Sequence, residues 1–158
     1  MLNRVDLTAT LKKIPWFLEL SPDSLNRLAD LADLSTIHVD EVIFTEGEQH
    51  AFLHIIISGK VSLESFVPGY GSLPYCTVEP LEVIGCSSLT PVVRQKTSTA
   101  RAVEQTTLLS FQADSLMALC ESDCDLGFIF MRRLANIVAS RMLNLRLHLL
   151  KLLACQKN

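Results

Sequence analysis

The feature that most constrains this chain is a change in the spacing of its apolar residues. From Ser35 onward they alternate with polar residues, in short runs separated by turn signals such as Ser58-Gly59 and the segment PGYG at 68–71. Short alternating runs at close spacing are typical of a β-sandwich or barrel. About eight such runs fall in residues 35–112, the number that a jelly roll needs. Ser58-Gly59 predicts a tight hairpin between its two neighbouring strands.

The segments on either side have helical spacing. Residues 1–34 predict N-terminal helices, one over Val5–Lys13 and one that starts at Ser21-Pro22, an N-cap hydroxyl followed by proline at the first helical position. Between them, the apolar segment PWFL at 15–18 is expected to plug the domain. Residues 113–153 predict C-terminal helices. We expect the first to be capped by Asp114, and the second to begin with Asp123 and Asp125 at its positive end.

The last helix carries an apolar stripe whose members are three or four residues apart. These residues are Leu134, Val138, Met142, Leu145, Leu149 and Leu152. A stripe with this spacing is typical of a coiled-coil seam and predicts a homodimer. The alternative is that the helix folds back on its own roll. Arg141 and Arg146 fall off the stripe, so we expect them to be solvated or to pair across the dimer.

Composition excludes several classes of protein. The 158 residues have a formal net charge of −3 and no basic block, which argues against direct nucleic acid binding. No stretch approaches the roughly 20 apolar residues of a membrane helix, so we expect no membrane insertion, and no signal peptide is recognisable. Five cysteines without framework spacing fit a reducing cytoplasm. We therefore expect one cytoplasmic domain over residues 1–158.

The stretch 80–103 contains a candidate ligand cassette. Glycine at 85 would let the backbone approach a ligand closely, and the small polar residues after it would form a concavity suited to an anion. A lysine on the returning segment could supply the counter-charge, although an ordinary turn is the alternative. The candidate ligand-binding residues are Gly85, Cys86, Ser87, Ser88, Lys96, Thr97, Ser98 and Thr99.

Other constellations predict neither a metal site nor an enzyme. His50 and His54 are four residues apart, whereas a cupin site needs two histidines two apart on one strand. Cys120 and Cys124 are interpreted as small structural residues rather than as a redox pair. The serines of the cassette have no general base placed by the sequence and no G-x-S-x-G elbow around them. We expect no metal and no catalytic residue.

The order of these elements resembles the cyclic nucleotide-binding domain of the CRP/FNR family. The resemblance rests on Gly47 and Gly59, which bracket GEQHAFLHIIISGKVSLE, on PLEVIGCSSL around Gly85, on KTSTARAVEQTTLLSF and on the two final helices. It covers nearly the whole chain. It implies an eight-stranded double-stranded β-helix, or jelly roll, with N-terminal helices and a long C-terminal dimerisation helix.

The chain departs from this family at two cassette positions. The resemblance implies a Glu after the glycine, which takes the ribose 2′-hydroxyl, and an Arg ten residues later, which clamps the cyclic phosphate. Here these positions are Cys86 and Lys96. Cysteine cannot replace an ionised acceptor, and lysine keeps the charge but loses the bidentate fork. We expect cAMP and cGMP binding to be weak or absent, which leaves another small anion, an apolar effector or a vestigial pocket.

The sequence thus predicts a non-enzymatic, ligand-sensing regulatory module. The effector would enter between Gly85–Ser88 and Lys96–Thr99, close against the last helix and bias its position for a partner protein to read. Family transcription factors continue into a helix-turn-helix; this chain ends at Asn158, so we expect no DNA-reading module of its own. The alternative is a ligand-free interaction or scaffold protein with a structural roll. In that case Phe66 and Tyr70 are candidates to fill the pocket.

Overall fold

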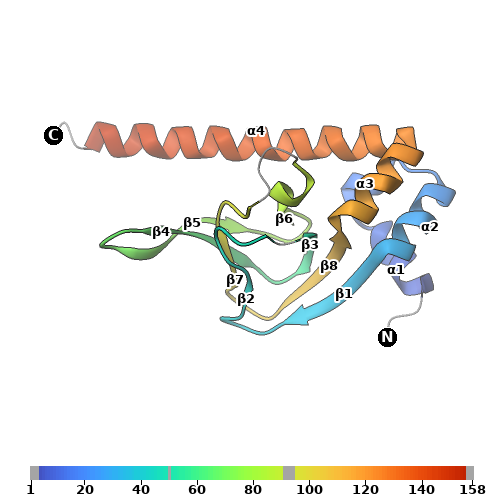
Figure 1. Cartoon of the computed structure of the whole chain (residues 1–158), viewed down its shortest axis with the longest axis horizontal. Helices are drawn as coiled ribbons and strands as arrows, with labels where there is room; N and C mark the ends of the chain where they lie inside the picture. Colours follow the sequence, from blue (N-terminus) through green and yellow to red (C-terminus); the bar gives the residue numbers. More distant parts are fainter. Residues whose placement is uncertain (1–3, 50, 91–94, 156–158) are drawn as a thin grey trace.

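A computed structural model describes residues 4–49, 51–90 and 95–155 of the chain. Within them, eight strands form two antiparallel sheets of four strands each, so the predicted β-roll is confirmed (Figure 1). The first sheet has the order β1 (Ala32–Ile37), β8 (Thr106–Gln112), β3 (Phe52–Ser58), β6 (Val83–Ile84). The second has the order β2 (Val42–Phe44), β7 (Thr99–Ala102), β4 (Val61–Val67), β5 (Gly71–Val78).

Helices flank the roll at both ends of the chain. The first group is α1 (Arg4–Leu11), the 3-10 helix η1 (Pro15–Phe17) and α2 (Pro22–Leu31). A second 3-10 helix, η2 (Cys86–Leu89), lies in the cassette, and α3 (Ala113–Ser122) leads into α4 (Cys124–Cys155), which has 32 residues. In Figure 1, α4 lies along one side of the roll and its C-terminal part extends past it. None of the helices described is apolar enough over a sufficient length to cross a membrane.

The side chains of β3 are divided between two apolar cores. On β3, Leu53 and Ile55 are buried in a core shared with the flanking helices, whereas Ile56 is buried in a second core inside the roll. Successive side chains of a strand point to opposite faces of its sheet. One strand can therefore serve both cores, which is why β3 is apolar over most of its length.

The connection at Ser58-Gly59 is not the predicted hairpin. β3 and β4 belong to different sheets, so the chain passes from one sheet to the other at this point. Gly59 makes this possible because its φ is +88° and because a Cβ there would lie 2.6 Å from the carbonyl oxygen of Gln105. The long hairpin of the fold is formed instead by β4 and β5, whose register runs from Val61↔Val78 to Val67↔Gly71.

Side-chain caps set the helix starts. The hydroxyl of Ser21 accepts a hydrogen bond from the Ser24 N–H at 3.1 Å, as the sequence predicts for α2. The prediction of Asp114 as the cap of α3 is wrong: the Gln112 side chain accepts from the Ser115 N–H at 2.6 Å. At α4, the Asp123 carboxylate accepts from the Leu126 N–H at 3.1 Å. That bond and a second from Ser24 hold the pKa of Asp123 below its usual value.

The first part of α4 is anchored to the N-terminal helices. Its Phe130 ring lies 5.7 Å from the ring of Trp16 and 6.4 Å from that of Phe17. Arg132 and Arg133 add ion pairs to Glu19 at 2.8 and 3.0 Å. The segment predicted to plug the domain therefore holds α4 in place.

Leu134 belongs to this anchor and not to an exposed seam. It is 7% exposed and packs in the core that the helices share with the first sheet. Its assignment to the dimer interface is therefore wrong, because a side chain already buried within its own chain has no surface to offer a partner.

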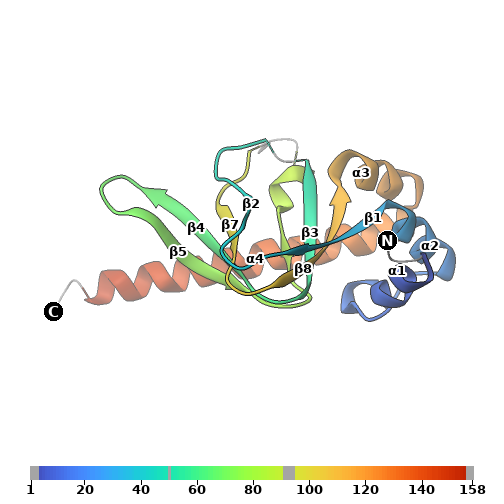
Figure 2. The same cartoon turned by 90° about the horizontal axis from the view of Figure 1, so that it is seen from below.

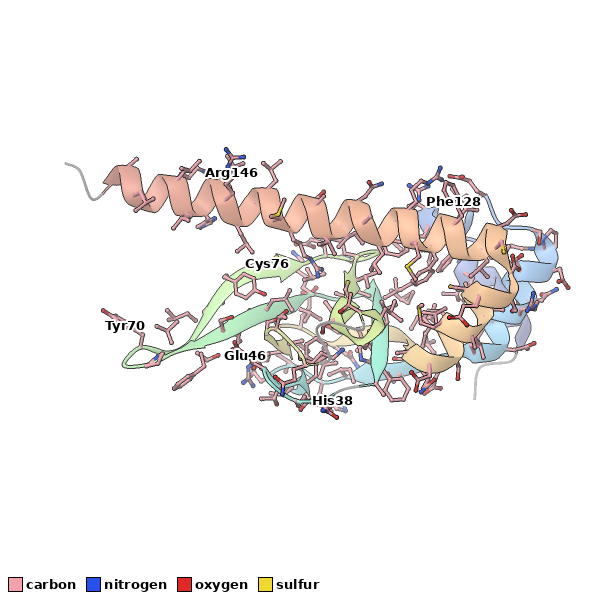
Figure 3. All side chains as sticks on the ribbon, turned by 45° about the horizontal axis from the view of Figure 1, so that its top comes forward. His38, Glu46, Tyr70, Cys76, Phe128 and Arg146 are labelled. Atoms are coloured by element: carbon pink, nitrogen blue, oxygen red, sulfur yellow. The ribbon has the colours of Figure 1, made fainter. Side chains whose placement is uncertain are left out.

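The β4–β5 hairpin projects from the roll, on the same side as the C-terminal part of α4 (Figure 2). Phe66 and Tyr70 lie on it with 67% and 79% of their surface exposed. Tyr70 is at the hairpin tip (Figure 3). The suggestion that these two rings fill the pocket is therefore wrong.

Gly59 and Gly69 both have positive φ, and comparing them tests the passage of the chain from one sheet to the other at Gly59. Gly59→Ala should cost about 3 kcal/mol or more of unfolding free energy, because it adds backbone clashes to the strain of positive φ. Gly69 is the matched control: its φ is +84° but a Cβ there meets nothing within 4 Å. Gly69→Ala should cost about 1 kcal/mol. Urea unfolding measures both, and equal costs would contradict the close approach at Gly59.

Candidate ligand pocket

A cavity of about 500 Å³ lies between the cassette and α4. Its walls come from three parts of the chain. The roll contributes Phe44, Leu63, Tyr75 and Cys76. The cassette and its returning segment contribute Gly85, Cys86, Ser87, Thr90, Lys96, Thr97 and Ser98. The middle of α4 contributes Val138, Arg141, Met142, Asn144, Leu145 and His148.

The cassette is a tight turn built around Gly85. Its φ is +81°, and a Cβ would lie 2.8 Å from the carbonyl oxygen of Phe52 and 3.0 Å from Lys96 Nζ, so no larger residue fits without displacing them. The Gly85 carbonyl accepts from the Ser88 hydroxyl at 2.7 Å and from the Ser88 N–H at 3.1 Å. The polar groups of Ser88 thus bond within the turn.

Lys96 faces the cassette, but its ammonium is held by the protein. Only 3% of the residue is exposed. Nζ donates to the carbonyl oxygens of Phe52 and Gly85, both at 3.1 Å, and lies 4.9 Å from the centroid of the Phe44 ring. Burial lowers the pKa of Lys96 from 10.5 to about 8, partly opposed by Cys86 and Glu48. Lys96 therefore ties the returning segment to the glycine turn.

Most of the predicted ligand-binding residues line the cavity, with two exceptions. Gly85, Cys86, Ser87, Lys96, Thr97 and Ser98 are part of its wall. Ser88 is turned toward the Gly85 carbonyl. The Thr99 hydroxyl accepts from the Glu46 N–H at 3.0 Å, outside the cavity.

Arg141 is the functional candidate that sequence reasoning placed wrongly. It was expected to be solvated or to pair across a dimer, but it lines the cavity and its Nη2 donates to the carbonyl oxygen of Val83. Its position could have indicated this: Val138, Arg141 and Leu145 share one helix face, since they are three and four residues apart. Arg146, on the next turn, points away from the roll (Figure 3).

Two thiols on the wall are protonated at neutral pH. Burial raises the pKa of Cys86 and of Cys76, and the nearby Arg141 opposes this shift only in part. Thiol nucleophiles act as thiolates. Neither side chain therefore has the environment of a reactive cysteine.

Of the other residues weighed as metal or redox groups, His54 and Cys120 are buried, whereas Cys124 is exposed. His54 is buried, and its Nδ1 shares a hydrogen bond of 2.8 Å with the Ser110 hydroxyl. His50 lies outside the described residues. Cys120 is buried beside Asp123 and Glu121, which together with burial raises its pKa to about 11. Over the described ranges, no three histidine, cysteine or acidic side chains gather as a metal site would require.

The pKa of Lys96 predicts how stability depends on pH. The unfolded chain keeps this proton up to about 10.5, whereas the folded chain loses it near 8. The unfolded state therefore binds more protons in this window, and the contribution of Lys96 to stability rises with pH, by up to about 3 kcal/mol. Urea unfolding of wild type and of Lys96→Met from pH 7 to 10.5 measures the difference. If the unfolding free energies of the two proteins change with pH in parallel, the lowered pKa of Lys96 is contradicted.

Comparison with known proteins places the chain in a family. A family model described as the cyclic nucleotide-binding domain matches residues 36–123, more than half of the 158 residues. A protein of Geobacter metallireducens GS-15 named for cyclic nucleotide binding is 25% identical, with a TM-score of 0.71 over 90% of this chain and 99% of that one. The catabolite activator protein of Thermus thermophilus is 25% identical, with a TM-score of 0.69. The match covers 84% of this chain and 62% of that protein.

A third solved structure has a similar fold. The sensor domain of the transcriptional regulator DNR from Pseudomonas aeruginosa is 19% identical, with a TM-score of 0.72 over 88% of this chain and 93% of that one. The resemblance that the glycines and the cassette carry is thus confirmed. The chain belongs to the cyclic nucleotide-binding domain family and has the fold of CRP/FNR-type regulators.

Proposed function

We propose that this protein is a non-enzymatic, ligand-sensing regulatory module of the cytoplasm that signals through α4. Its family is that of cyclic nucleotide-binding domains. A small effector would occupy the cavity between the cassette and α4. The module would dimerise through the C-terminal part of α4 and pass the occupancy of the cavity to a partner protein. Cys76, Cys86, Cys120 and Cys124 are free thiols, which fits a reducing compartment.

One observation carries this proposal. Val138, Met142 and Leu145 line the cavity and also belong to the apolar stripe expected to form the dimer seam. A ligand and a partner helix would therefore contact the same three side chains. Filling the cavity changes what these side chains pack against, and so changes the free energy of any contact that the helix makes elsewhere.

The cassette argues against a cyclic nucleotide as the preferred effector. Cys86 offers no ionised acceptor for a ribose hydroxyl, and burial keeps its thiol protonated. Lys96 Nζ already donates to two carbonyl oxygens, so only one of its three N–H donors is left for a phosphate.

The C-terminal part of α4 supports the dimer. Ile137 still packs against the core, but beyond it Val138, Met142, Leu145 and Leu149 each expose more than half of their surface. Apolar surface of this extent on a single helix is typical of a contact with another protein. Leu152 continues the predicted seam in sequence.

We expect cAMP and cGMP at about 1 mM to stabilise the wild type by less than about 0.4 kcal/mol, the value for a dissociation constant of 1 mM. The double variant Cys86→Glu/Lys96→Arg restores the pair that the family resemblance implies. It should gain a cyclic nucleotide-dependent increase in melting temperature. Thermal-shift titration measures both proteins. A large shift in the wild type would show that the cassette is functional as it stands.

The same assay separates a sensor from a ligand-free scaffold. A screen of small anionic and apolar compounds should find ligands that stabilise the wild type. They should fail on Met142→Trp, because the indole would occupy the cavity from an exposed position of α4. If no compound stabilises the wild type, the structural-scaffold alternative is favoured.

The dimer has its own test. Leu149→Glu should shift the protein toward monomer in sedimentation velocity at micromolar concentration, because it puts a charge into the proposed seam. Leu18→Glu is the matched control, since Leu18, directly after η1, is 69% exposed and Leu149 is 57% exposed. A wild type that is already monomeric, or equal effects of the two variants, would contradict dimerisation through α4.

A further inference from the structure

The cavity carries positive charge and no negative charge. The charged groups of Lys96 and Arg141 line it, and none of the described lining residues has a carboxylate. Glu48 and Glu82 influence Lys96 and Cys76 electrostatically but are not part of the wall. A pocket bounded by cationic groups alone attracts an anion, and the low dielectric of a half-enclosed site strengthens that attraction.

Arg141 is better placed than Lys96 to hold this anion. Lys96 Nζ is buried on two carbonyl oxygens and the Phe44 ring. The guanidinium of Arg141 has five N–H donors, of which the bond to the Val83 carbonyl uses one at Nη2. Its planar fork also suits a carboxylate or sulfonate. The anion contact thus comes from α4 and not from the cassette.

The rest of the wall is mostly apolar. Phe44, Leu63 and Tyr75 line it from the roll. Val138, Met142 and Leu145 face them from α4. A volume of about 500 Å³ lies in the usual range for pockets that bind small organic molecules, about 300–1,000 Å³. Such a wall favours a ligand with a hydrophobic body over one with the many hydroxyl and ring-nitrogen groups of a nucleotide.

We infer that the cavity binds an amphipathic anion, a hydrophobic body that carries one carboxylate or sulfonate group, with Arg141 of α4 as the residue that recognises the charge. This inference rests on the proposed sensor function and names its ligand class. Because the recognising residue is on α4, the ligand would join the helix to the roll directly. The cassette would shape the pocket without supplying the anion contact.

Two fluorescent probes that differ only in charge test this inference. 8-Anilinonaphthalene-1-sulfonate is an aromatic monoanion, and N-phenyl-1-naphthylamine is the same ring system without the sulfonate. Fluorescence titration of the wild type should show saturable binding of both, with the sulfonate probe bound more tightly. Arg141→Met should weaken the sulfonate probe by about tenfold to a hundredfold, the value of a charge-assisted hydrogen bond. The neutral probe should change by less than about twofold.

Two further variants keep the test specific to the cavity. Arg146→Met removes the same charge from the face of α4 that points away from the roll (Figure 3), and should change neither titration. Met142→Trp should weaken both probes, because it fills the space they occupy. Sulfonate binding that survives Met142→Trp would lie outside the cavity and overturn the inference.

The outcomes also separate this inference from the proposed function. Equal binding of both probes, unaffected by Arg141→Met but abolished by Met142→Trp, would overturn the role of Arg141 and leave a ligand-sensing pocket in place. If neither probe binds the wild type, both the ligand class and the sensor function are wrong. Equal losses in Arg141→Met and Arg146→Met would assign the effect to net charge and overturn the inference.

Discussion

The packing of Phe130 against Trp16 and Phe17 is the interaction on which the rest of the structure depends. Buried aromatic side chains contribute more stabilisation per residue than almost any other contact. This cluster fixes the first turns of α4 against the N-terminal helices and so sets which face of the helix meets the roll. The position of Arg141 over the cassette follows from it, although Arg141 is remote from the cluster in sequence.

In the cassette, the shape of the pocket wall and the availability of its charge depend on the same hydrogen bonds. The Gly85 carbonyl accepts from Ser88 and from Lys96, and this shared acceptor holds the turn and the returning segment together. The same bonds engage the ammonium that would otherwise meet an anionic ligand. A lysine in this position therefore stabilises the pocket wall, whereas charge recognition passes to a different element.

The roll could be predicted from sequence because alternation reports directly which side chains are buried. The crossing at Gly59 could not, since a short break with glycine looks the same whether two strands pair or change sheets. The carbonyl partner of Lys96 at Phe52 lies 44 residues earlier, beyond any local pattern. Helix periodicity identifies which residues share a face but not what lies opposite that face. For this reason the sequence predicted the wrong surroundings for both Arg141 and Leu134.

The first part of α4 is buried in the core and its middle is tied to the roll through Arg141, so the helix can act as a lever about its buried part. From Leu134 to the end of the helix is about 30 Å, and Arg141 lies about 10 Å from that pivot, at a rise of 1.5 Å per residue. A displacement of about 0.7 Å at the cavity would then move the far end by about 2 Å, which is the size of helix shift that repacks subunit interfaces. The geometry thus multiplies a movement smaller than a bond length about threefold, before any partner is involved.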